Sequence, residues 1–243
     1  MVTSILDINI TSNKTDIKRI IDKEEKGVMA TINANILYNA YKNKIYKNLL
    51  QNNTINICDG SLVASLFNLI SKKKIISYSG PDFFIDYIKE TKYKHAFIGT
   101  TSKVLKGLST NLSKYNSSIK DSLFLPVPFK SVEEFDYFEI SKKINEVNPD
   151  FIWVSLGAPK QELFSCELFK YINSGFIVPV GAAFDFYSND GESNRCPLFL
   201  RKLKLEWLFR LFMQPKKTSK RLIMEIVFMP IIFLKEIFNK IKK

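Results

Sequence analysis

Over the first two-thirds of the chain, short apolar runs alternate with longer amphipathic stretches, and this alternation limits the folds that the chain can adopt. Each apolar run is bounded by Gly, Pro, Asn or Asp, which is typical of short buried strands. In the first long stretch, Ile36, Leu37 and Ala40 begin a series of apolar residues at helical spacing. Strands that alternate with helices imply βαβ units, so we expect an α/β fold with a mostly parallel sheet and helices on both faces.

The expected elements follow from these runs. The strands are Val28–Ile32, Ile55–Cys58, Ala96–Ile98, Phe151–Leu156 and Phe176–Val180. The helices are Asn33–Leu50, Leu62–Ser71, Phe83–Thr91, Ser102–Tyr115, Val132–Val147 and Lys160–Asn173. The 46% hydrophobic content of the 243 residues is ample for a packed core. We therefore expect one α/β body over residues 1–190, with a ligand at the carboxyl ends of its strands.

Residues 191–243 differ in composition and are expected to form a basic, amphipathic, helical appendage. From Arg195 to Lys243 there are 13 Lys and Arg against three acidic residues, a net charge of +10. Residues 1–194 therefore carry only +2 of the total charge of +12. Such a basic end indicates an anionic partner, which could be lipid headgroups, phosphates or nucleic acid. A merely solvated tail is the alternative, and the high apolar content of the tail argues against it.

The apolar part of this tail favours a membrane surface. The run Leu222–Leu234 is interrupted by Glu225 and Pro230 and is shorter than the about 20 apolar residues that cross a bilayer. Lys and Arg flank the run on both sides, which is typical of a helix that lies among anionic headgroups. The alternative is a helix docked on its own body or on a sister subunit, and the two are compatible when the tail docks only in part. Nucleic acid is disfavoured, because the basic residues alternate with bulky aliphatic side chains.

Several common chemistries lack their signatures. The cysteines Cys58, Cys166 and Cys196 are widely spaced, so reduced thiols are expected rather than disulfides or a zinc site. The single histidine, His95, has no G-x-S-x-G motif to accompany it. The Walker A, G-x-G-x-x-G and D-x-D phosphate or metal–nucleotide motifs are missing. We therefore expect no bound metal and no cofactor, and the first residues show no signal-peptide pattern.

Polar residues at the ends of the expected strands are candidates for a ligand site. Asp59 follows the strand Ile55–Cys58, and its carboxylate could act as a general base or simply belong to a turn with Gly60. Thr31 and Asn33 end another strand, where they could bind sugar or phosphate or cap the next helix.

Two further segments suit phosphate. Ser155–Glu162 (SLGAPKQE) forms a loop into a helix, whose free N–H groups and positive dipole end favour an anion. Gln161 and Glu162 are expected to point from the first turn of that helix. Asp185 follows a later strand, and behind it come four arginines whose guanidinium groups suit a diphosphate: Arg195, Arg201, Arg210 and Arg221.

Taken in order, these segments resemble the WecG/TagA/CpsF family of bacterial glycosyltransferases. The matching segments are ATIN (30–33), CDG (58–60), SGPDFF (79–84), FIGTTSKV (97–104), PDFIWVSLGAPKQE (149–162), VGAAFDF (180–186), NRCP (194–197) and LEWLFRLFMQPKKTSKR (205–221). They span nearly the whole chain, from Val28 to Arg221. The last three segments together with GAPKQE are specific, whereas any one of them alone is weak.

The resemblance implies a Rossmann-like body with a C-terminal membrane-binding appendage that helps to complete the active site. It implies an inverting, metal-independent transfer of an N-acetylmannosamine-type sugar or related hexose from a UDP-sugar donor. The implied acceptor is an undecaprenyl-diphosphate-linked sugar, in the synthesis of a cell-surface polysaccharide. A peripheral position at the cytoplasmic face of the membrane goes with such an acceptor, and a homo-oligomer is left open.

Matching positions carry the family's site residues over to this chain. By that resemblance Asp59 would be the catalytic base. Thr31, Asn33 and Gln161 would line the sugar-nucleotide pocket. The cations for the donor or acceptor diphosphate would be Arg210, Arg221 and, joining them, Arg195.

Some positions depart from the family pattern and leave the donor sugar open. The usual D-G-x-G is here Asp59-Gly60-Ser61-Leu62, the usual R-A-P is Arg195-Cys196-Pro197, the usual E-P-x-R is Gln214-Pro215-Lys216-Lys217, and Lys204 replaces a Gly. The alternative function is a catalytically inactive, membrane-associated scaffold that binds sugar nucleotides.

Overall fold

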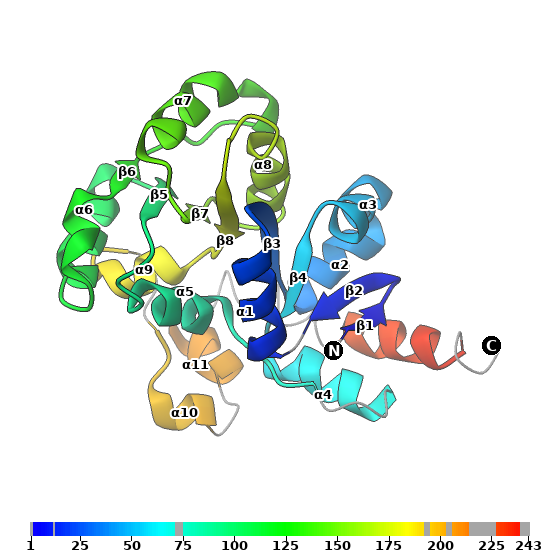
Figure 1. The fold of residues 1–243 in the computed structure, drawn as a ribbon. Helices are drawn as coiled ribbons and strands as arrows, with labels where there is room; N and C mark the ends of the chain where they lie inside the picture. Colours follow the sequence, from blue (N-terminus) through cyan, green and yellow to red (C-terminus); the bar gives the residue numbers. More distant parts are fainter. Residues whose placement is uncertain are drawn as a thin grey trace.

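The computed structural model of the chain describes residues 2–11, 13–70, 75–191, 195–202, 206–213 and 227–238. The described strands form one eight-stranded sheet in the order β1-β2-β4-β3-β8-β7-β5-β6 (Figure 1). The strands are β1 (Val2–Ile5), β2 (Ile8–Thr11), β3 (Lys26–Ile32), β4 (Ile55–Cys58), β5 (His95–Gly99), β6 (Leu123–Leu125), β7 (Phe151–Ser155) and β8 (Gly175–Pro179). The β1–β2 hairpin is antiparallel, and the other described pairs are parallel. The predicted α/β fold with a mostly parallel sheet is confirmed.

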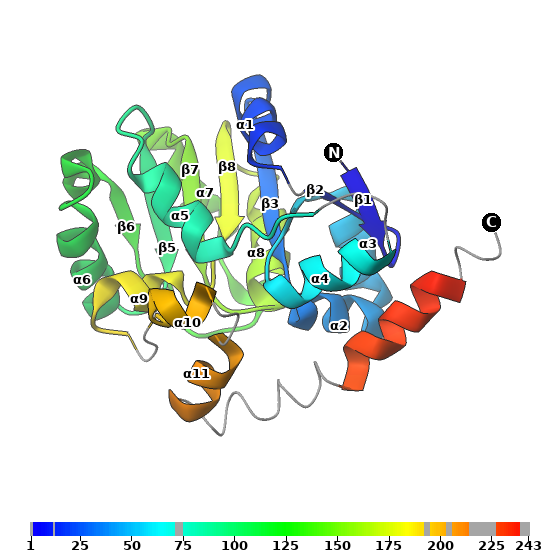
Figure 2. The same ribbon diagram turned by 90° about the horizontal axis from the view of Figure 1, so that it is seen from below.

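Helices cover both faces of this sheet (Figures 1 and 2). They are α1 (Lys14–Lys23), α2 (Ala34–Lys42), α3 (Lys44–Asn52), α4 (Ser61–Ile70), α5 (Gly80–Ile88), α6 (Ser102–Leu112), α7 (Tyr137–Val147), α8 (Lys160–Leu168), α9 (Ala183–Ser188), α10 (Leu198–Lys202) and α11 (Glu206–Met213). Helices α1, α5, α6 and α9 share a core with one face of the sheet, and α2, α3, α7 and α8 contribute to cores on the other. Successive strand residues alternate between the faces, so Met29 joins the first core and Val28 and Ala30 the others.

The five predicted strands are present as β3, β4, β5, β7 and β8, within two residues of their expected ends. The single helix predicted over Asn33–Leu50 is wrong, because Asn43 divides it into α2 and α3. The backbone of Asn43 is extended, and its N–H bonds to the Asn39 carbonyl oxygen at 2.9 Å to end α2. Its side-chain oxygen then accepts from the Tyr46 N–H at 3.0 Å and caps α3.

The helix formed by residues 227–238 packs against the β1–β2 hairpin and α2 (Figure 2). Phe228, Met229 and Ile232 are buried in this contact, and the Phe228 ring lies edge-on to the Tyr38 ring with 4.9 Å between centroids. The Glu236 carboxylate accepts from the backbone N–H of Leu6 at 3.0 Å. Docking on the body, the alternative considered for the tail, therefore holds for this segment. Within the described ranges, no helix is long and apolar enough to span a membrane.

His95 is buried at the start of β5 and gives the fold a pH-sensitive element. The Trp153 indole N–H donates to His95 Nδ1 at 3.1 Å, so the proton of the neutral ring is on Nε2. That nitrogen is buried and has no hydrogen-bond partner among the described residues. Burial lowers the pKa of His95 to about 4, because the charged ring would lose its hydration.

We expect the free energy of unfolding to fall as the pH is lowered from 7 to 5. Between pH 6.5 and the lowered pKa of His95, the unfolded chain takes up a proton that the folded chain excludes. This effect reaches about 3 kcal/mol when the pH has fallen to the folded pKa. Urea unfolding at pH 7, 6 and 5 measures it, with His95→Phe as the control, because His95 is the single histidine. An equal pH dependence in the variant would contradict the assignment.

Candidate active site

The sheet has a topological switch point between the neighbouring strands β3 and β8. The chain leaves β3 into α2 on one face of the sheet and leaves β8 into α9 on the other. Connections that diverge in this way open a crevice at the carboxyl ends of the strands, where α/β proteins bind ligands. Helices α10 and α11 lie beyond the same ends of the strands (Figures 1 and 2).

Thr31, Asn33 and Asp59 meet at the ends of β3 and β4. The Asp59 N–H donates to the Ile32 carbonyl oxygen at 2.8 Å, which fixes the residues after the two strands side by side. The Asn33 side chain accepts from the Ile36 N–H at 3.2 Å, so it caps α2, as the capping alternative predicted. A Cβ atom on Gly60 would lie 4.0 Å from that of Asn33.

Helix α5 begins against the same strand end. A Cβ atom placed on Gly80 would be only 3.3 Å from the Thr31 hydroxyl, so the first turn of α5 packs directly on Thr31. Ser79 caps this helix, because its hydroxyl accepts from the Asp82 N–H. Thr31 itself is buried, so its hydroxyl lies beneath the first turn of α5 rather than on the outer surface.

The loop after β7 brings Gln161 to the end of β8. The Ser155 hydroxyl donates to the Gly181 carbonyl oxygen at 2.8 Å, and a Cβ on Gly181 would lie 3.6 Å from Gln161 Oε1. The Gly157 N–H donates to that same oxygen at 3.2 Å, so this N–H is already engaged by the protein. Gln161 and Glu162 were expected to point from the first turn of the helix, but both are buried. Burial raises the pKa of the Glu162 carboxyl.

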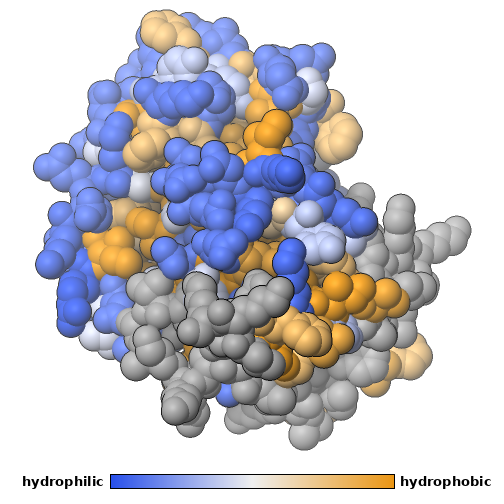
Figure 3. Space-filling model, turned by 90° about the vertical axis from the view of Figure 1, so that its right-hand side faces the viewer, coloured by the Kyte–Doolittle hydropathy of each residue, from blue (hydrophilic) through white to orange (hydrophobic). Residues whose placement is uncertain are grey.

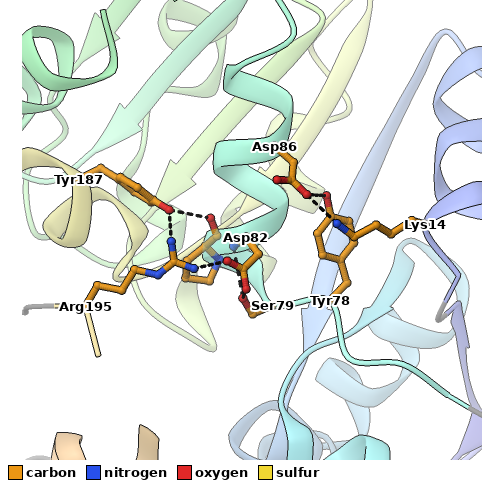
Figure 4. Close-up of polar contacts among 8 residues, drawn as sticks. Lys14, Tyr78, Ser79, Asp82, Asp86, Tyr187 and Arg195 are labelled. Atoms are coloured by element: carbon orange, nitrogen blue, oxygen red, sulfur yellow. Dashed lines mark hydrogen bonds and ion pairs between the residues drawn. The ribbon is translucent and has the colours of Figure 1, made fainter. Parts of the chain in front are cut away.

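Arg195, in the segment after α9, reaches the first turn of α5 (Figure 4). Its guanidinium group donates to the Asp82 carboxylate and to the Tyr187 hydroxyl, and Tyr187 donates to the Pro81 carbonyl oxygen at 3.3 Å. Asp82 also accepts from the Ser79 hydroxyl at 2.6 Å. The first turn of α5 therefore holds Arg195 on one side and contacts Thr31 on the other.

Asp82 and Tyr187 were not singled out from the sequence, although both lie in or beside segments that match the family. The side chain of Arg210 and all of Arg221 lie outside the described residues, so their convergence on the crevice stays a prediction.

The thiol and carboxyl groups near these strand ends bear on two kinds of chemistry, attack by a cysteine and catalysis by a bound metal ion. Burial, with a smaller effect of the Asp59 carboxylate, raises the pKa of the Cys58 thiol to about 12, so this thiol is protonated near neutral pH and is a poor nucleophile. Over the described ranges, no three His, Cys, Asp or Glu side chains come together as a metal site would require. The residues around these strand ends thus carry a carboxylate, a hydroxyl, two amides and a guanidinium group, which suit a polar, anionic ligand.

The fold belongs to the open α/β class that binds ligands beyond the carboxyl ends of its strands, and comparison with known proteins gives its family. Residues 3–243 match the model of the glycosyl transferase WecG/TagA/CpsF family, and the chain belongs to that family. It is therefore a glycosyltransferase.

Two of its similar relatives carry the same name. The N-acetylglucosaminyldiphosphoundecaprenol N-acetyl-beta-D-mannosaminyltransferase of Bacillus subtilis (strain 168) is 27% identical over 208 residues, which are 84% of this chain and 78% of the relative. The Staphylococcus aureus (strain MW2) enzyme of the same name is 22% identical over 195 residues, which are 79% of this chain and 74% of the relative.

Proposed function

We propose that this glycosyltransferase moves an N-acetylmannosamine-type sugar or related hexose from a UDP-sugar to a polyprenyl-diphosphate-linked acceptor. The observation that supports the proposal is the placement of polar residues beyond three adjacent strands in a member of this family. Thr31, Asn33 and Asp59 end or follow β3 and β4, and Gln161 lies beside Gly181, which follows β8. The names of the relatives support an undecaprenyl-diphosphate-linked N-acetylglucosamine as the acceptor.

In the proposed reaction, Asp59 accepts the proton of the acceptor hydroxyl as its oxygen attacks the anomeric carbon of the donor sugar. The bond from that carbon to the diphosphate oxygen breaks, the configuration inverts, and UDP leaves with the bonding electrons. Arg195 has the charge and the planar fork that a leaving diphosphate needs, once its guanidinium group turns from Asp82 toward the ligand. We propose that Arg210 and Arg221 add to this charge and that no metal ion takes part.

Acceptor-dependent release of UDP tests this function. A panel of UDP-sugars, including UDP-N-acetylmannosamine, is incubated with a synthetic polyprenyl-diphosphate-N-acetylglucosamine, with and without EDTA. We expect at least one donor to release UDP only when the acceptor is present, at a rate that EDTA does not change. A chain that binds the donor and transfers nothing would instead be the inactive scaffold, and loss of activity in EDTA would contradict the metal-independent step.

We also propose that the protein sits peripherally on the cytoplasmic face of the membrane, through a basic appendage beyond residue 190. Helix 227–238 supports this, because the face opposite its docked side is apolar. Val227, Ile231, Leu234 and Phe238 recur along that face and are 46% to 62% exposed. Figure 3 shows the side of the molecule where this helix lies, and hydrophobic residues gather on the lower part of that side.

Replacing these four side chains with Ser is expected to weaken binding to anionic vesicles by about tenfold or more, because each buries apolar surface in the headgroup region. Removing the whole helix would be a poorer test, because it would also uncover the core around Ile36 and Leu37. Vesicle sedimentation measures the effect. Phe238→Ser and Phe138→Ser form a matched pair, since the two rings are 62% and 67% exposed and Phe138 lies on the distant α7. Unchanged sedimentation of the fourfold variant would place the anchor elsewhere.

A further inference from the structure

Glu162 is a fully buried carboxylate in the first turn of α8, next to Gln161, with 0% of its surface exposed. Both of its oxygens accept hydrogen bonds. The Tyr46 hydroxyl donates to Oε2 at 3.0 Å, and Gln161 Nε2 donates to Oε1 at 2.8 Å. Burying a carboxylate in this way costs free energy even when it is hydrogen-bonded. Because this burial is costly, the two hydrogen-bond partners, Tyr46 and Gln161, are the best guide to the role of Glu162.

These contacts determine which way round the Gln161 amide lies. The Gly157 backbone N–H can only donate, so the atom it meets at 3.2 Å must be the Gln161 carbonyl oxygen. The amide nitrogen must then face Glu162, and a carboxylate is the acceptor that this nitrogen needs. One N–H and one lone pair of the amide remain unused by these two bonds. Gly181 has no side chain to cover that edge, as a Cβ there would lie 3.6 Å from Oε1 and 3.9 Å from Nε2.

Tyr46 reaches Glu162 from a different helix. Asn43 caps α3 by accepting from the Tyr46 N–H, which fixes where the helix starts and sets Tyr46 in its first turn. The Tyr46 ring is buried in the core shared by α2, α3 and helix 227–238, so its hydroxyl is held in place by packing. A series of hydrogen bonds therefore runs from Asn43 through Tyr46 and Glu162 to Gln161, and it connects the first turn of α3 to the first turn of α8.

We propose that Glu162 and Tyr46 are positioning residues that hold the Gln161 amide in one orientation, so that it presents one N–H donor and one carbonyl acceptor to the donor sugar. The role of the sugar rests on the proposed function, whereas the orientation of the amide does not. Neither Glu162 nor Tyr46 touches substrate in this proposal, and both act through Gln161.

The titratable groups around Glu162 decide whether acidification disturbs the Gln161 amide. They are Tyr46 from α3 and Cys166 one turn along α8, and burial raises the pKa of the Cys166 thiol to about 12. Both therefore stay protonated near neutral pH, and Glu162 is the group in this cluster that changes charge as the solution is acidified. A protonated Glu162 can donate from Oε2 to the Tyr46 hydroxyl oxygen while Oε1 still accepts from Gln161, because a hydroxyl oxygen also accepts. We therefore expect protonation of Glu162 to leave the KM for the donor nearly unchanged.

A double-mutant cycle tests the coupling. Glu162→Leu is expected to raise the KM for UDP-N-acetylmannosamine about tenfold with a smaller change in kcat, and Tyr46→Phe to raise it less. In a Gln161→Ala background, both substitutions should leave the KM unchanged, because the group they orient is gone. Additive effects in the two backgrounds would overturn the proposal and leave Glu162 and Tyr46 with a general structural role. If Glu162→Leu does not fold, the Tyr46→Phe cycle, which keeps the ring, gives the same answer.

Glu162→Gln is the conservative control. Its amide oxygen can still accept from Gln161, and its amide nitrogen can donate to the Tyr46 oxygen. Gln has nearly the shape and the hydrogen-bonding pattern of a protonated Glu, so we expect this variant to keep the parental KM within about threefold. A tenfold rise of KM in Glu162→Gln would overturn the assignment.

A readout without any substrate separates this inference from the proposed function. The chain has three glutamines, Gln51, Gln161 and Gln214, so single substitutions assign the side-chain amide signals of ¹⁵N-glutamine-labelled protein. The Gln161 amide protons should be well dispersed in the parent and shift toward free-amide values in Glu162→Leu and Tyr46→Phe. Identical Gln161 signals in parent and variants would overturn the inference even in an active enzyme. The expected shifts in a protein that transfers no sugar would leave it standing while the proposed function fails.

Discussion

Asp59→Asn is expected to lower the rate of sugar transfer by at least about 10²-fold, with little change in the affinity for the UDP-sugar. The amide has nearly the shape of the carboxylate and keeps the backbone hydrogen bond to Ile32, so the strand ends should stay in place. It cannot accept the proton of the acceptor hydroxyl. Acceptor-dependent UDP release measures the rate, and calorimetric titration with the donor measures the affinity.

Asp86→Asn is a suitable control for that substitution. Asp86 lies one turn along α5 from Asp82, where it accepts from the Tyr78 hydroxyl at 2.8 Å and pairs with Lys14 at 2.7 Å (Figure 4). Its loss should leave transfer close to the parental rate. Undiminished UDP release by Asp59→Asn would rule out Asp59 as the base. A loss of transfer in both variants, with lower melting temperatures, would point to the fold instead.

Gly99→Ala is expected to reduce the free energy of unfolding by about 3 kcal/mol or more. Gly99 pairs with Ser155 between β5 and β7 and has a φ of 120°, where other residues are strained. A Cβ atom there would lie 2.3 Å from the Ser155 carbonyl oxygen, so one of the two strands must move. Because the Ser155 hydroxyl also holds Gly181, the shift should disturb the Gln161 side of the crevice as well. Urea unfolding measures the loss.

Gly157→Ala is the control that separates the cost of backbone strain from the cost of a steric clash of the new Cβ atom. Gly157 also has a positive φ, 76°, but a Cβ there would meet no atom within 4 Å. Its cost should therefore be the backbone strain alone, about 1 to 2 kcal/mol. Equal losses in the two variants would contradict the collision at Gly99.

The parts of the fold that could be predicted are those whose residue pattern is compatible with a single type of secondary structure. The strands β3, β4, β5, β7 and β8 are buried on both faces, so each is a nearly continuous apolar run, and their order along the chain implied the parallel sheet. The β1–β2 hairpin gave no such signal. Its turn consists of Leu6 and Asp7 with φ values of 50° and 59°, where Gly or Asn is usual, so nothing in the sequence marks it.

The residues of the candidate site also fall into those that the sequence could predict and those that it could not. Asp59, Thr31 and Asn33 were predictable because each directly follows or ends a recognisable strand. Asp82, Tyr187 and Tyr46 come to the crevice only through tertiary packing, and their contacts link residues that are far apart in the chain. The break at Asn43 shows the limit most clearly, because an apolar helical pattern continues through it while the side chain of Asn43 caps a new helix.

The contact between helix 227–238 and the β1–β2 hairpin joins segments that the ribosome makes late and early. While the chain is being synthesised, the side of the hairpin that includes Ile5 and Leu6 has no cover from that helix. A nascent chain can therefore form the β3–β8 part of the sheet and still carry an incompletely buried edge until helix 227–238 emerges. Translation products that stop short of this helix should be the forms that chaperones and proteases act on first, even when their active-site crevice is already complete.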